Sequence, residues 1–168
     1  SPFSVIDVER VCSEASLWTR LQFLPPAGNL LLLSTATGPH YIIDTISTNV
    51  VAELRFTGPR TMSNPAAVGG GSGEVDVRSE LDRANHGQGI CVAPDGKSVL
   101  MGLPSGRVCI WDISGVNGDS SSPRDTEGGR GITVIETNKQ WDGVHASAVN
   151  VCGFNPVYMM AVTGGDSL

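Results

Sequence analysis

The sequence predicts an all-β fold, and three observations lead to this prediction. Apolar runs shorter than eight residues recur along the chain, bounded by Gly, Pro or Asn, which favours strands over helices. The 21 Gly and 10 Pro among 168 residues indicate frequent turns. Runs such as residues 30–33 and 108–111 are almost continuously apolar, as expected for strands that are covered on both faces. We therefore expect little or no helix.

One segment defines a repeat unit. Residues 92–97 (VAPDGK), an apolar run, the Ser105-Gly106 pair and residues 107–112 (RVCIWD) alternate between strands and tight turns. The segment closes on Trp111-Asp112, and this pattern is typical of one WD-repeat blade of a β-propeller. We expect Trp111 to pack between blades with its indole N–H bonded to an acceptor, so Trp111 and Asp112 are interpreted as structural. Nothing near Trp111 supports the alternative of a substrate-stacking role.

Two further copies flank this unit. Residues 17–56 predict a complete blade of four strands, and residues 145–163 predict the first strands of a last one. The residues that end each first strand, Phe23, Val92 and Phe154, lie 69 and 62 residues apart, whereas a WD repeat spans about 40–45. Two loops rich in Gly, Ser and Pro account for the surplus. The predicted organisation is an outer strand of a preceding blade in residues 1–9, a blade in 10–57, a flexible insert in 58–85, a blade in 86–140 with a loop insert at 114–131, and a partial last blade in 141–168.

Charge and cysteine usage restrict the partners and the compartment. A net charge of −6 argues against a broad surface for duplex nucleic acid, which needs clustered Lys and Arg. No apolar run approaches the ~20 residues of a membrane span, so no membrane is expected. The four cysteines show no C-x-x-C spacing, and we interpret them as reduced core thiols of a protein in the cytosol or nucleus.

His145 and Asp166 are the candidate polar pair. His145 lies where the repeat places a histidine that bonds an aspartate in a turn, and Asp166 occupies that turn in the same copy. We interpret the pair as structural. The alternative, a general base, needs a nucleophile, and no G-x-S-x-G elbow or cysteine partner is present. In the middle copy Arg83 and Ser105 occupy the two positions, so packing is expected to hold that blade.

The remaining candidates predict neither a cofactor nor a metal. His40 and His86 are isolated, and with dispersed cysteines they form no tetrahedral zinc spacing. The glycine-rich residues 69–73 lack the Gly-Lys-Ser/Thr ending of a phosphate loop, so we interpret them as a linker. We predict no catalytic residue and no enzyme.

Several arginines lie in or beside the long loops, where they suit an acidic or phosphorylated peptide. Solvated loop charge is the interpretation that the sequence favours, with partner contact as the alternative. The arginines concerned are Arg55, Arg60, Arg78, Arg83 and Arg130.

Particular strands resemble a known family. The segments are residues 18–23 (WTRLQF), 30–34, 42–44, 94–96 with 106–111, and 151–156 (VCGFNP) followed by a Met-Met-Ala strand. Together they resemble the C-terminal part of the small WD-repeat subunit shared by the COMPASS histone methyltransferase complex and the cleavage and polyadenylation machinery. The loops are longer here than family members usually carry.

The resemblance implies a seven-bladed propeller, of which this chain supplies about three blades. It implies a nuclear, non-catalytic adaptor that docks on a SET-domain histone methyltransferase and on cleavage/polyadenylation and phosphatase-module subunits. It also implies an association with the phosphorylated tail of RNA polymerase II. A generic WD-repeat adaptor, such as a ubiquitin-ligase substrate receptor or a trafficking subunit, is the alternative. We expect three blades by themselves to expose apolar faces and to be stable only beside further blades or a partner.

Overall fold

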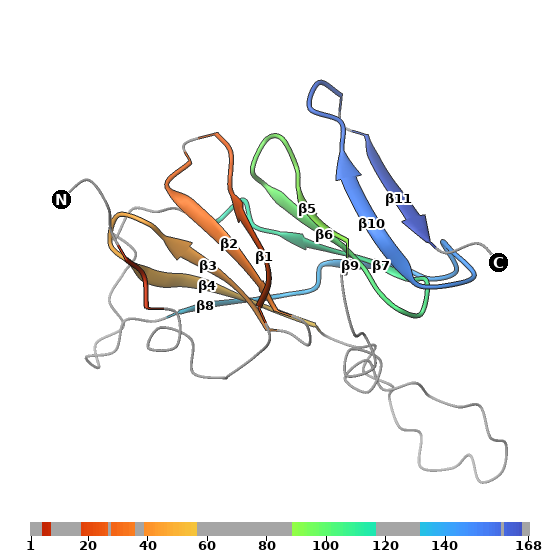
Figure 1. Cartoon of the computed structure of the whole chain (residues 1–168), viewed down its shortest axis with the longest axis horizontal. Coiled ribbons are helices and arrows are strands. Elements are labelled where there is room, and N and C mark those ends of the chain that lie inside the picture. The colour runs from red at the N-terminus through yellow and green to blue at the C-terminus, as the bar shows by residue number, and fades with distance from the viewer. Residues whose placement is uncertain are drawn as a thin grey trace, which may run out of the picture.

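The computed structural model describes residues 5–7, 18–26, 28–35, 39–56, 89–116, 132–158 and 160–165. These residues form strands, turns and extended connections, with no helix among them, so the all-β prediction is confirmed. They build three separate sheets that follow one another along the chain (Figure 1). Within the described residues no helix is long and apolar enough to cross a membrane.

The first sheet has the order β1-β2-β3-β4-β8. Its first four strands form an antiparallel meander, and β8 pairs in parallel with β4. Local chemistry explains the turn between β3 and β4, where the Asp44 carboxylate accepts the backbone N–H of Ile46 at 2.9 Å. The strands are β1 (Trp18–Phe23), β2 (Leu30–Thr35), β3 (His40–Asp44), β4 (Asn49–Arg55) and β8 (Thr133–Glu136).

The second sheet has the order β5-β6-β7-β9 and is antiparallel throughout. The turn between β5 and β6 is held by the Asp95 carboxylate, which accepts the Lys97 backbone N–H at 3.0 Å, while Gly96 takes a positive φ of 70°. The third sheet pairs β10 with β11. The strands are β5 (Ile90–Val92), β6 (Ser98–Gly102), β7 (Val108–Asp112), β9 (Lys139–Trp141), β10 (Val149–Phe154) and β11 (Ala161–Gly165).

Two details differ from the sequence prediction. Residues 133–136 lie inside the range expected for the second unit, yet as β8 they join the first sheet. The reason is that Ile135 packs on the core shared by the first two sheets. Of the outer strand predicted in residues 1–9 only residues 5–7 are described; they form no strand, although Ile6 packs on the outer face of the first sheet. The insert predicted at 58–85 lies outside the described residues, as do residues 117–131 of the second loop.

The sheets stack face to face, and the core lies between them (Figure 1). Strands such as β3 and β5 are covered on both faces and are buried along their whole length. This explains why their sequences are almost continuously apolar. The first and second sheets share a large cluster that includes Leu32, Ile42, Leu54, Val99 and Trp111. The second and third sheets share a smaller one formed by Cys91, Leu100, Val108, Val149 and Cys152.

Candidate functional site

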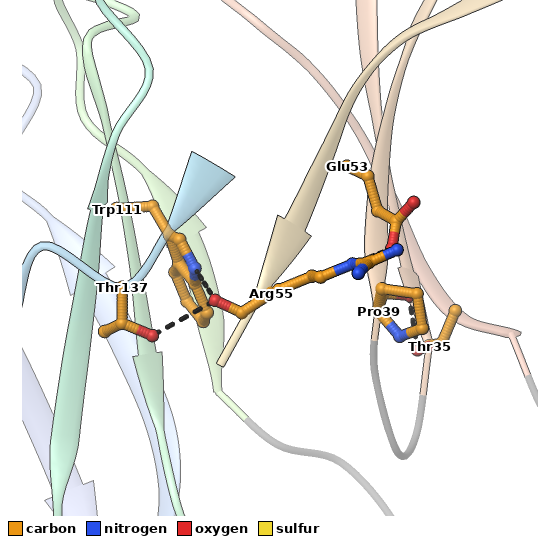
Figure 2. Close-up of polar contacts among 6 residues, drawn as sticks. All are labelled: Thr35, Pro39, Glu53, Arg55, Trp111 and Thr137. Carbon is orange, nitrogen blue, oxygen red and sulfur yellow. Dashed lines mark hydrogen bonds and ion pairs between the residues drawn. The ribbon is translucent and has the colours of Figure 1, made fainter. Parts of the chain in front are cut away.

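The first and second sheets meet at the backbone carbonyl of Arg55, at the end of β4. This oxygen accepts the indole N–H of Trp111 at 2.9 Å, and it also accepts the backbone N–H and the hydroxyl of Thr137 at 3.1 and 3.2 Å. Figure 2 shows the carbonyl between Trp111 and Thr137. One acceptor therefore connects β4, β7 and the connection between β8 and β9. We call these three residues the Arg55 junction.

Aromatic rings fill the space beside the Arg55 junction. Trp111 is fully buried, with ring centroids 4.7 Å from Phe56 and 5.7 Å from His40. Both contacts are edge-to-face, the arrangement that aromatic quadrupoles favour. The junction thus combines a large apolar surface with one satisfied polar group.

His40 is a neutral member of this aromatic group. It is fully buried, and its Nδ1 accepts the Thr35 backbone N–H at 3.2 Å, which assigns the ring proton to Nε2. Nε2 has no hydrogen-bond partner among the described residues. Burial lowers the pKa of His40 to about 4, because a charged ring would lose its hydration there. The described residues contain no group of three or more metal-ligating side chains.

The Arg55 side chain points away from the junction that its carbonyl forms (Figure 2). Its guanidinium pairs with the Glu53 carboxylate, and 57% of its side chain is exposed. Of the arginines predicted to contact partners, only Arg55 lies among the described residues. Arg60, Arg78 and Arg83 lie outside them, as does Arg130.

Asp112 lies at the surface rather than in the core. Its carboxylate accepts the Ser114 backbone N–H at 2.9 Å, and hydrogen bonds from Ser114 hold the pKa of Asp112 below its ordinary value. It lines an open hollow of about 420 Å³ together with Asp95 and Lys97. The structure therefore gives Asp112 a turn-closing role next to the buried Trp111.

His145 has a partner in β11 that the sequence did not predict, and its predicted pairing with Asp166 stays a prediction. Its Nε2 lies 2.8 Å from the Thr163 hydroxyl in β11, and its backbone N–H donates to Gly106 at 3.2 Å. Asp166 lies outside the described residues. Sequence reasoning missed Thr163, although a hydroxyl inside an apolar strand is the signal that marks it. His145 thereby fastens the middle of β11 to the turn between β6 and β7.

Three cysteines, Cys91, Cys109 and Cys152, are free and buried. Burial raises the pKa of Cys91 to about 12 and that of Cys152 to about 11. Both therefore remain protonated near neutral pH and behave as small apolar side chains. Cys12 lies outside the described residues.

No protein-family model matches the chain, and no curated protein matches it significantly. The fold and the site together define an all-β protein of stacked sheets that are joined through a buried tryptophan.

Proposed function

We propose that this chain is part of a WD-repeat β-propeller that serves as a non-catalytic scaffold in the nucleus. Its three sheets would be three consecutive blades, and its roles would be in histone lysine methylation and in mRNA 3′-end processing with transcription termination. The strand segments that resemble the small WD-repeat subunit support that function. The proposed partners are a SET-domain methyltransferase subunit and subunits of the cleavage/polyadenylation and phosphatase modules, with the phosphorylated polymerase tail as a third ligand.

The observation that carries the proposal is the position of Trp111. This residue closes the third strand of its repeat, is fully buried between two sheets, and donates its N–H to the neighbouring sheet. A tryptophan in a WD repeat is expected to occupy this place, because a buried indole needs both an apolar surface and an acceptor.

The outer faces of the stack also support a larger ring. On the third sheet, Val151 and Val162 are 64% and 65% exposed. On the first sheet, Leu21 and Phe23 are 62% and 61% exposed. In a closed propeller these faces would be covered by further blades, just as the equivalent faces of the second sheet are covered here.

A non-catalytic role agrees with the state of the candidate reactive groups. His145 is engaged with Thr163, His40 is buried and neutral, and the thiols of Cys91 and Cys152 have raised pKa values. Each is better suited to holding the sheets together than to a reaction.

Affinity purification of the full-length protein from nuclear extract tests the proposed function. We expect histone methyltransferase and polyadenylation subunits to be recovered with it, and an untagged strain serves as the control. Recovery of neither set would overturn the proposal. Recovery of a ubiquitin-ligase or trafficking assembly in their place would support the generic adaptor instead.

A further inference from the structure

We propose that the outer edge of β4 is a docking site for an extended segment of a partner protein, and that β8 occupies this edge as a replaceable strand. The inference deepens the proposed scaffold function and rests on it, because it assigns to one partner a place on the fold. Four features of β8 support it: its pairing, its burial, its anchor and its sequence.

The pairing of β8 is that of an added strand. Every other strand pair in the described part of the chain is antiparallel, whereas β8 runs parallel to β4. Thr133 lies opposite Ala52, so the two strands come from distant parts of the sequence. Addition of an extended segment to an exposed sheet edge is a general mode of peptide recognition. The edge of β4 accepts such a segment here from the same chain.

The burial of β8 is slight. Ile135 is half-buried against the core shared by the first two sheets, while Thr133, Val134 and Glu136 are exposed. The strand has only four residues, and only one of them turns a side chain into the core. Short, exposed edge elements are the parts of a fold that open most easily.

Thr137, which anchors the end of β8, can leave without making a buried polar group lose its last hydrogen bond. The Arg55 carbonyl that holds Thr137 also accepts the indole N–H of Trp111. This carbonyl therefore stays bonded when Thr137 leaves, and no desolvation penalty arises at the junction. Beside β8, however, Ala52 and Leu54 of β4 are fully buried. Because departure of β8 would expose them, the edge favours an exchange of strands over an empty site.

The register defines the chemistry of the partner segment. Ile135 lies opposite Leu54 and Glu136 lies opposite Arg55. Thr137 follows, with its amide and hydroxyl on the Arg55 carbonyl. The fitting segment is extended and carries in succession a β-branched apolar residue, an acidic residue and a Ser or Thr.

Peptide binding to the full-length protein tests the exchange. The probe is a fluorescent peptide with the sequence of residues 132–138 (ITVIETN), and the readout is anisotropy. Ile135→Asp in the protein should expel β8 from the edge, so this variant should bind the probe about tenfold more tightly than wild type, because the open fraction sets the apparent affinity. Thr133→Asp is the matched control: it adds the same charge at an exposed position, opposite the uncharged Ala52, and should bind as wild type does. Equal affinity of Ile135→Asp and wild type would overturn the proposal.

Hydrogen exchange on the wild-type protein tests the opening of β8 independently of any variant. The amides of residues 133–136 should exchange at least about tenfold faster than those of β2 and β3. Equal protection of β8 and β3 would overturn the proposal. If the full-length protein recovers its nuclear partners but the peptide test fails, the docking site on β4 is wrong and the scaffold function stands. If the peptide binds but no nuclear partner is recovered, the proposed scaffold function is wrong, while strand exchange at β4 stands.

Discussion

The two junctions between the sheets reach the same stacking by opposite means. Between the first and second sheets, the rings of Trp111, Phe56 and His40 fill the gap, and one carbonyl fastens it. Between the second and third sheets, the backbones approach one another. A Cβ at Gly89 would overlap the backbone of Val151 and Cys152, and a Cβ at Gly102 would overlap Val149. The first junction depends mainly on the volume of its rings, whereas the second places glycines at the points where its strands approach most closely, beside a smaller apolar cluster.

This difference means that the junctions should fail under opposite changes. Removing atoms should damage the first, because it leaves a cavity among close-packed rings. Adding atoms should damage the second, because there is no room for even one methyl group.

The largest effect is expected for Trp111→Ala. The change removes the largest fully buried side chain and leaves the first junction with a cavity, so the free energy of unfolding should fall by about 4 kcal/mol in chemical denaturation. Trp111→Phe is the control, because it keeps a six-membered ring while it removes the N–H donor and a smaller part of the volume; it should cost about 2 kcal/mol. Equal losses for the two variants would contradict the dominance of volume at this junction.

His40, which packs against Trp111 between the first two sheets, should make the free energy of unfolding depend on pH by about 3 kcal/mol. The pKa of His40 is about 4 in the folded protein, below the ordinary 6.5, so the unfolded chain binds the extra proton. The neutral, buried His40 therefore contributes fully to the free energy of unfolding above pH 6.5, and this contribution is lost as the pH falls from 6.5 towards 4. Denaturant unfolding of wild type and His40→Leu across this range should show a smaller loss in the variant. Parallel pH profiles would contradict a neutral, buried His40.

A loss of about 2 kcal/mol is expected for Gly102→Ala at the second junction, because the new methyl overlaps Val149. Gly115→Ala is the matched control, since a Cβ at Gly115 meets nothing within 4 Å. It should change the free energy of unfolding by less than about 0.5 kcal/mol. Equal effects of the two substitutions would show that the second junction tolerates added volume.

The smallest effect, below about 1 kcal/mol, is expected for Thr137→Val. This change removes one hydroxyl from the Arg55 carbonyl, which keeps the Trp111 indole and the Thr137 amide as donors. Thermal unfolding measures it, with wild type as the reference. A loss as large as that of Trp111→Phe would show that the hydroxyl, and not the indole, fastens the sheets.

The strands that pair through local turns could be predicted from the sequence, and those that pair over long distances could not. The runs at 30–34, 40–44 and 108–112 are apolar and bounded by turn residues, and each forms a strand beside its neighbour in sequence. The pairing of β8 with β4 depends on contacts across some 80 residues, and Thr133 to Glu136 carry no local signal that names their partner. The bond between His145 and Thr163 was missed for a related reason: the sequence pattern favours an aspartate in the turn, while the hydroxyl lies inside a strand.

The parallel pairing of β8 also has a consequence for the order of events during synthesis. The hairpins from β1 to β4 can close as soon as they leave the ribosome, because their contacts are local. The edge of β4 then stays open until residues 133–136 have been made, roughly 80 residues later. At about 5–20 residues per second this interval lasts several seconds. The nascent chain therefore carries an open strand edge to which a chaperone or an early partner has access before the chain closes it.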